Sequence, residues 1–140
     1  NGDPDIDAIC RMEHAPECKF KNSIFPFTSN KPSPFNSQNT YLKREVIKHY
    51  FLYPHVGRMD DIWASYYVEA KGFKVLYNEP SVYQKRNIHN LTHDMKKEYI
   101  GYENNLNLNK ELKKNPNNIK NFLPKKSWAA FKLYQKILNK

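Results

Sequence analysis

The central stretch of the sequence reads Gly57-Arg58-Met59-Asp60-Asp61-Ile62-Trp63-Ala64-Ser65-Tyr66. From Ile62 onward its residues favour a helix, and Gly72 is a natural stop for that helix. We expect Asp60 or Asp61 to be the N-cap, because a carboxylate accepts hydrogen bonds from the free amides of a first turn. Capping does not account for both residues, since like charges on neighbours repel each other. The pair therefore indicates a carboxylate that is held for catalysis or for binding hydroxyl groups.

Length and charge place the chain among single globular domains. Its 140 residues are enough for one hydrophobic core. Residues 1–105 hold 14 Lys and Arg against 13 Asp and Glu, whereas residues 106–140 hold 9 Lys against Glu111 alone. Because the body is close to neutral, we do not expect it to present a basic face to a specific nucleic acid.

Two further features concern the cellular compartment. No stretch approaches 18 consecutive apolar residues, so we expect no membrane-spanning helix. The two cysteines, Cys10 and Cys18, are too few for a disulfide framework. We therefore expect a reducing, cytoplasmic compartment.

The hydrophobic pattern predicts an α/β fold. Short strands are expected within residues 8–12, 20–27 and 73–77, and helices over residues 43–51 and 91–102 and after Asp61. Residues 104–121 are rich in Asn and Lys and are expected to form a linker that buries little. Ser127 can cap a last amphipathic helix whose apolar side carries Trp128, Phe131, Tyr134, Ile137 and Leu138. We thus divide the chain into a domain over residues 1–103 and a basic segment over residues 104–140.

Potential metal ligands occur at two places, and each has an alternative structural interpretation. The spaced carboxylates of Asp3, Asp5 and Asp7 suit a hard cation, although Asp3 before a proline is also an ordinary turn residue. His89 and His93 lie four residues apart near the start of a predicted helix. One of them is therefore either a surface or capping histidine or a metal ligand.

A run of polar side chains lies within the first third of the chain, in the stretch Pro34-Phe35-Asn36-Ser37-Gln38-Asn39-Thr40. As structure, these residues form a capped loop before the next helix. As a binding site, they offer neutral donors and acceptors of the kind that hold sugar hydroxyls. The 10 Tyr and 2 Trp of the chain also suit sugar recognition, because an aromatic face stacks on the apolar face of a pyranose.

Taken together, these motifs resemble those of two related protein families. Three segments resemble the C-terminal half of the reversibly glycosylated polypeptides, the plant UDP-arabinopyranose mutases. They are residues 58–64 (Arg-Met-Asp-Asp-Ile-Trp-Ala), 72–75 (Gly-Phe-Lys-Val) and 96–99 (Lys-Lys-Glu-Tyr). The segment before that half is similar to residues 3–8. Residues 34–40, 61–63 and 86–89, the last reading Arg-Asn-Ile-His, resemble the STELLO-type glycosyltransferase-like proteins. The resemblance covers residues 2–103 and implies the acceptor-side part of a GT-A glycosyltransferase fold, followed by a C-terminal helix.

The resemblance also implies roles for individual residues. Asp60 and Asp61 would be the catalytic pair, because inverting enzymes of this type use a carboxylate to deprotonate the acceptor hydroxyl. Arg58 would assist with the charge of the donor diphosphate, and His89 would contribute to a metal site. The remaining substrate-binding residues would be Asn36, Gln38, Asn39 and Trp63. The partners would be a nucleotide-sugar and a carbohydrate or glycoconjugate acceptor, with a divalent cation, Mn²⁺ or Mg²⁺, as cofactor.

Two parts of the family pattern have no counterpart in these residues. The first is the βαβ half that holds the nucleotide and ends in a DxD metal motif. The second is the self-glycosylated arginine of the mutases, which lies upstream of the matched region. We therefore expect a fragment of a transferase, and we do not carry mutase activity over to it.

An alternative function belongs to a different class. The basic segment over residues 104–140 suits a non-catalytic binding or assembly module that docks on anionic membrane headgroups or RNA. Peripheral membrane contact through this segment is compatible with either function.

Overall fold

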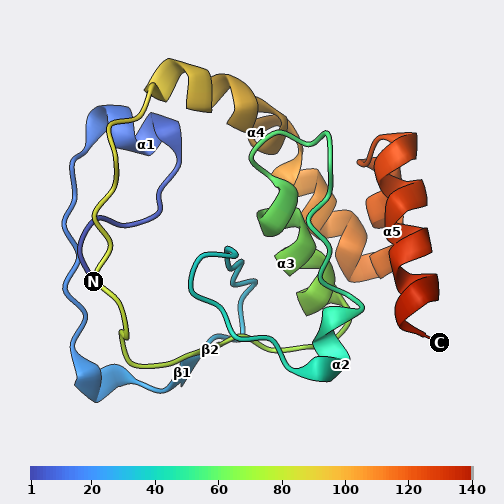
Figure 1. Ribbon diagram of the computed structural model, residues 1–140, viewed down its shortest axis with the longest axis horizontal. Coiled ribbons are helices and arrows are strands. Elements are labelled where there is room, and N and C mark those ends of the chain that lie inside the picture. Colours follow the sequence, from blue (N-terminus) through green and yellow to red (C-terminus); the bar gives the residue numbers. More distant parts are fainter. Residues whose placement is uncertain (140) are drawn as a thin grey trace.

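The computed structural model describes residues 1–139 and is mostly helical. Helices account for 49% of the chain and strands for 5%, so helices rather than a sheet form the core. Figure 1 shows α3 and α5 on one side of the molecule and long loops on the other, with α4 running from α1 on the loop side to α3 and α5. The helical segments, including the 3-10 turns η1 and η2, are α1 (Ala8–Glu13), η1 (Asn22–Ile24), α2 (Arg44–Ile47), α3 (Asp60–Ala70), α4 (Leu91–Lys114), η2 (Pro116–Asn121) and α5 (Lys125–Leu138).

The sheet is small. It consists of β1 (Phe27–Thr28) and β2 (Leu76–Tyr77), which pair antiparallel with Phe27 opposite Tyr77. Among residues 1–139, no other strand joins these two, and no GT-A type of sheet is formed. The α/β prediction is therefore confirmed only as a combination of helices with a short sheet. Only the last two residues of the predicted 73–77 strand pair with a partner, because β1 is equally short.

Residues 8–12 form helix α1 rather than the predicted strand. The Asp7 side chain caps this helix by accepting a hydrogen bond from the Cys10 amide at 3.1 Å. The Ala8 amide donates to the buried carboxylate of Glu98 on α4 at 2.7 Å. These bonds satisfy two amides of the first turn, and the contact with Glu98 spans 90 residues of sequence. The short apolar run alone did not indicate it.

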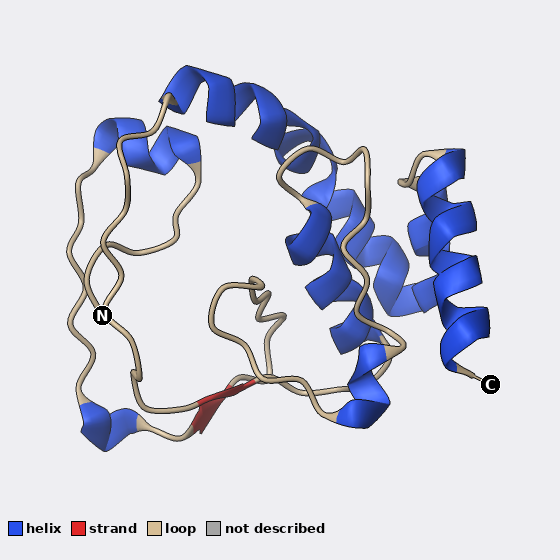
Figure 2. Cartoon of the chain, in the orientation of Figure 1, coloured by secondary structure: helices blue, strands red, loops and turns tan. Residues whose placement is uncertain are grey.

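The hydrophobic core lies where α3 meets α4, η2 and α5 (Figure 2). Trp63, Tyr53 and Phe131 are fully buried there. The indole nitrogen of Trp63 donates to Asn105 of α4 at 2.8 Å, which satisfies the one polar atom of that ring. The Phe131 ring meets Tyr67 edge to face, with centroids 5.1 Å apart.

The predicted linker over residues 104–121 is wrong. Its first part continues α4 to Lys114, and its second part is η2. Leu108 and Leu112 lie one helical turn apart and are buried, and Ile119 is fully buried beside them. The Lys residues of this segment therefore lie toward solvent, whereas Leu108, Leu112 and Ile119 enter the core and Leu106 stays exposed.

The C-terminal helix is confirmed, but its start differs from the prediction. It begins at Lys125 after Pro124, so Ser127 lies inside the first turn instead of capping it. The Ser127 hydroxyl donates to the Pro54 carbonyl. Phe131, Trp128 and Tyr134 face the core as expected, whereas Ile137 and Leu138 are exposed.

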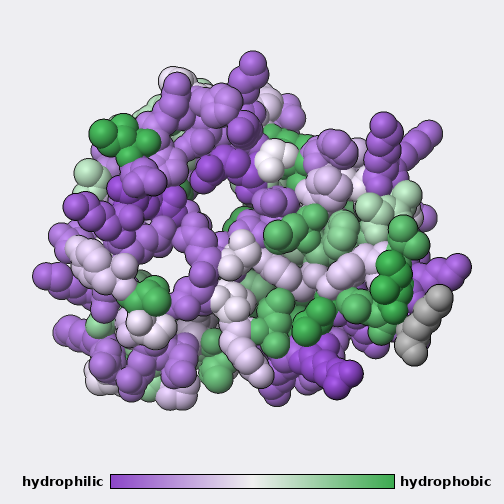
Figure 3. All heavy atoms as spheres, in the orientation of Figure 1, coloured by the Kyte–Doolittle hydropathy of each residue, from purple (hydrophilic) through white to green (hydrophobic). Residues whose placement is uncertain are grey.

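The loop side of the molecule, which includes residues 1–35, has no comparable hydrophobic core. Within residues 1–35 only Gly2 and Ala8 are buried. Backbone bridges from Gly2 to Cys18 and to Gln84 hold the loops together. Figure 3 shows openings between this side and the helical side, surrounded mainly by hydrophilic residues. None of the helices formed by residues 1–139 has the length and apolar character needed to cross a bilayer.

Candidate functional site

Asp60 and Asp61 are the first two residues of α3. Met59 is the N-cap and makes no side-chain capping bond, so the prediction that one aspartate is the N-cap is wrong. Both carboxylates instead lie in the first turn, where the positive end of the helix dipole attracts negative charge. The preceding turn depends on Gly57, which has a φ of 64° and whose added Cβ would lie 2.0 Å from the Lys97 carbonyl oxygen. A close approach of this turn to α4 therefore fixes where α3 begins.

The polar loop over residues 36–39 reaches the aspartate pair through Ser37. One carboxylate oxygen of Asp61 accepts hydrogen bonds from the Ser37 amide at 2.9 Å and from the Ser37 hydroxyl at 3.1 Å. Beside this contact, the Phe35 ring stacks on Tyr50 with centroids 5.3 Å apart. The loop and the start of α3, which the sequence analysis treated as parts of one site, are thus in contact.

Tyr50 is a member of this site that the sequence analysis missed. Burial raises the pKa of Tyr50 well above its usual range, and the charges of Asp61 and Asp60 raise it further. The Tyr50 hydroxyl is buried, and no residue among 1–139 forms a hydrogen bond with it. It is therefore a neutral phenol held beside two carboxylates. The sequence did not indicate this role, because Tyr50 lies within residues 43–51, which were predicted only as a helix.

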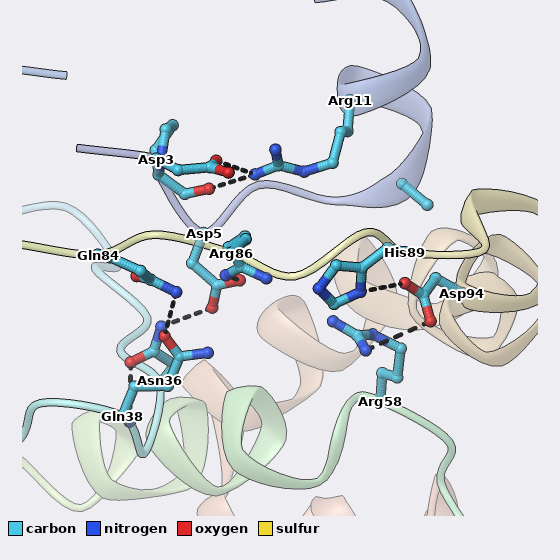
Figure 4. Close-up of polar contacts among 12 residues, drawn as sticks. Asp3, Asp5, Arg11, Asn36, Gln38, Arg58, Gln84, Arg86, His89 and Asp94 are labelled. Atoms are coloured by element: carbon cyan, nitrogen blue, oxygen red, sulfur yellow. Dashed lines mark hydrogen bonds and ion pairs between the residues drawn. The ribbon is translucent and has the colours of Figure 1, made fainter. Parts of the chain in front are cut away.

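The three predicted sugar-binding amides also have partners within the protein, and Figure 4 shows those of Asn36 and Gln38. Asn36 donates to Asp5 at 2.6 Å and accepts from the Gln38 amide at 3.1 Å. Gln38 accepts from the Gln84 side chain at 3.0 Å, and Asn39 donates to Ser81 at 3.2 Å. The loop thus connects the start of α3 with residue 5 and with residues 81–84.

Asp5 itself pairs with Arg86. The sequence analysis noted Arg86 only as the first residue of the Arg-Asn-Ile-His motif. The Arg86 side chain is 8% exposed, and Asp5 is 29% exposed. A nearly buried guanidinium needs such a carboxylate, since an unpaired charge at that depth is costly. Asp3 pairs with Arg11 at 2.7 Å, and Asp7 caps α1. Each member of the Asp3, Asp5 and Asp7 series therefore has a structural contact.

Arg58 and His89 lie beside each other, and both contact Asp94 (Figure 4). The Arg58 guanidinium lies 2.9 Å from Glu98 and 3.4 Å from Asp94, and Nδ1 of His89 lies 3.0 Å from the second oxygen of Asp94. Together with Arg86 these four residues line one shallow pocket. Two carboxylates therefore already balance the positive charge of Arg58.

Glu98 ties this pocket to the fold. It is 4% exposed, and its second oxygen accepts from the Ala8 amide and from the Tyr102 hydroxyl at 2.6 Å. Burial and the bond to Glu98 raise the pKa of Tyr102, which keeps the phenol protonated as a donor. A buried glutamate on a polar helix gave no signal in the sequence.

The other predicted site residues are placed as follows. Trp63 lies in the core and is 0% exposed, so its ring has no surface available for stacking on a sugar. His89 has Asp94 beside it, but residues 1–139 contain no group of three His, Cys, Asp or Glu side chains arranged to hold a metal ion. The described residues therefore do not form a complete metal site, and the divalent cation stays a prediction. Cys10 and Cys18 are both free thiols.

Comparisons of this chain with protein-family models, with curated proteins and with solved structures find no match. Function is therefore inferred from the geometry of the site itself.

Proposed function

We propose that the chain is the acceptor-side part of a glycosyltransferase, in which Asp60 is the general base. The observation that carries this proposal is the unequal use of the two carboxylates. Asp61 is occupied by two hydrogen bonds from Ser37, whereas Asp60 takes part in no side-chain hydrogen bond or ion pair among residues 1–139. A carboxylate that is held near a second one and is left unpaired suits proton transfer to and from a bound ligand.

The reaction would begin with a hydroxyl group of the acceptor beside Asp60. As the hydroxyl oxygen attacks the anomeric carbon of a nucleotide-sugar, its proton moves to the Asp60 carboxylate. The bond from the anomeric carbon to the diphosphate breaks, and the nucleoside diphosphate leaves. Asp61 would be a positioning residue, because its bonds to Ser37 fix the loop against α3.

The amide residues would then divide into two roles. Both polar groups of Asn36 are used inside the protein, so Asn36 orients the loop. Gln38 has a free amide nitrogen and Asn39 a free amide oxygen, and both residues are exposed. We infer that Gln38 and Asn39 contact the sugar hydroxyls. Arg58, which is paired with two acidic residues, would stabilise the pocket more than it would bind a phosphate.

Acceptor binding tests the proposal on the chain as it stands. Neutral mono- and disaccharides titrated into the labelled protein are expected to shift the amide NMR signals of Ser37, Asp60 and Gln84. Asp60→Asn should weaken the binding by about tenfold, the effect of one lost charge-assisted hydrogen bond. Glu13→Gln is the matched control, since Glu13 is a solvent-exposed carboxylate on the distant α1. The proposal fails if no saccharide shifts these signals, or if both variants weaken the binding equally.

The outward face of α5 favours a second candidate function, docking on an anionic membrane surface. Leu133 and Ile137 are each 59% exposed on this face. Helical periodicity places Lys126, Lys132 and Lys136 around them. Exposed apolar residues among lysines favour a lipid surface over RNA, because an interfacial helix inserts apolar side chains while its lysines attract anionic headgroups.

Vesicle binding tests this second candidate. Phosphatidylglycerol vesicles should bind the protein and phosphatidylcholine vesicles should not. Each lysine near an anionic surface contributes about 1 kcal/mol, so reversing Lys126, Lys132 and Lys136 to Glu should abolish the binding. Reversing the exposed Lys19, Lys21 and Lys31 on the loop side serves as the control. Binding to single-stranded RNA without binding to vesicles would contradict the membrane assignment.

A further inference from the structure

A second cavity lies near the C-terminal end of α3, at the other end of this helix from the aspartate pair. Its volume is about 380 Å³, which lies within the range of about 300–1,000 Å³ that is usual for small-molecule sites. It is enclosed by the segments 29–33 and 72–75 and by residues of α3 and α4. Nothing in the proposed reaction at Asp60 uses this space.

The charged residues that line the cavity are mostly positive. Lys31, Lys74 and Lys113 come from three different segments, and all three are exposed. The one carboxylate of the lining is Glu69, whose oxygen Oε2 accepts a hydrogen bond from the Ser33 amide at 2.8 Å. Burial raises the pKa of Glu69, and this single carboxylate is outnumbered by the three lysines. The cavity therefore favours an anion.

The uncharged part of the lining suits a sugar ring. Tyr66 and Phe73 contribute aromatic rings, and Asn30 and Asn109 contribute amide groups that can bond to hydroxyls. The Phe73 ring is held in place on its other side by His49, with centroids 5.5 Å apart. Asn109 already donates to the Asn105 carbonyl at 2.9 Å, which leaves its amide oxygen for a ligand. A free inorganic anion would use the lysines alone and would make no contact with the aromatic rings or with this oxygen.

We propose that this cavity binds an anionic saccharide, a sugar that carries a phosphate or a carboxylate group. Its role as an acceptor subsite rests on the proposed function, whereas the binding itself does not. Glu69 follows Asp61 by eight residues on α3, which places the two sites about 12 Å apart along the helix. The same loop joins them, because Ser33 bonds to Glu69 and Ser37 bonds to Asp61. An acidic oligosaccharide along this loop would have its anionic group in the cavity and its reacting hydroxyl at Asp60.

The test compares four probes by NMR titration of the intact chain. These are glucose 6-phosphate, glucuronate, glucose and inorganic phosphate. The two anionic sugars should shift the signals of Phe73 and Asn109 and should bind at least about tenfold tighter than glucose or phosphate, since each charge-assisted bond contributes about that factor. Replacing Lys74 and Lys113 by Ala should remove this preference. Replacing Lys120 and Lys125 by Ala makes the same change of net charge outside the cavity and should have no effect.

Each alternative outcome is informative. Equal binding of glucose and the anionic sugars, or equal loss in both double variants, would overturn the proposal. Phosphate that binds as tightly as glucose 6-phosphate would overturn the saccharide part of it. Shifts at Phe73 and Asn109 without shifts at Ser37 and Asp60 would support the cavity and count against the proposed acceptor site. The reverse pattern would support the acceptor site and overturn the cavity proposal.

Discussion

The helical side and the loop side of the molecule are stabilised in different ways. On the helical side, Trp63, Tyr53 and Phe131 are fully buried, and the rings of Tyr53 and Phe131 pack edge to face. On the loop side, few residues are buried, and position is set by hydrogen bonds to the helical side, such as those from Ala8 to Glu98 and from Ser37 to Asp61. The candidate site lies where these bonds join the two sides. Apolar packing therefore provides the stability, and the polar bonds provide the geometry of the site.

The largest effect is expected from a core substitution on the helical side. Trp63→Ala should lower the free energy of unfolding by about 3–5 kcal/mol, because it removes a fully buried ring and leaves a cavity. Phe27→Ala on the loop side should cost less than about 1 kcal/mol, because Phe27 is 50% exposed. Urea denaturation of both variants measures the difference. Similar losses would mean that the two sides share stability equally.

A smaller effect is expected at the bonds that join the two sides. Glu98→Gln should cost about 1–3 kcal/mol, since an amide group would turn a donor toward the Arg58 guanidinium or toward the Ala8 amide. Hydrogen exchange should become faster in α1 while the core amides of α3 stay protected. Glu103→Gln changes an exposed carboxylate on the same helix and serves as the control. Loss of protection across α3 as well would show that the sides unfold as one unit.

The smallest effect is expected at His49, whose pKa is lowered by burial and by the charges of Lys71 and Lys48. The unfolded chain, with a histidine pKa near 6.5, takes up a proton before the folded chain does as the pH falls. Wild-type stability should therefore decrease from pH 7.5 to pH 5.5 relative to His49→Phe, which has no proton to bind. Above the unfolded pKa the gap between the two proteins should stay constant. Thermal melts of both proteins across this range measure the difference in stability. A difference that stays constant from pH 7.5 to pH 5.5 would contradict the prediction.

The sequence was most informative where the periodicity was strong. It predicted the helix after Asp61, the helix that begins at residue 91 and the inward positions of Trp128, Phe131 and Tyr134 on α5, because these depend on local spacing. It failed for residues 104–121, where composition concealed the spacing of Leu108 and Leu112.

The site was predicted less completely than the helices. The sequence placed Asp60, Asp61 and the polar loop in one site because their residue types agreed in chemistry. The bonds of Glu98 to Ala8 and of Arg86 to Asp5 each join residues more than 80 positions apart, and no local pattern encodes such contacts. Trp63 illustrates the opposite error, since it was predicted to bind substrate beside the Asp60 and Asp61 pair and is a core residue.

The most direct measurement of the central claim is the rate of sugar transfer by an enzyme that contains this chain, with Asp60→Asn and Asp61→Asn compared with the unchanged protein. Nucleotide-sugar affinity is measured for the same three proteins. If Asp60 is the general base, Asp60→Asn should lower the rate by about 10²–10⁴-fold and leave the affinity unchanged. Asp61→Asn should have a smaller effect, because an amide oxygen still accepts from Ser37. Full transfer activity in Asp60→Asn would contradict the account.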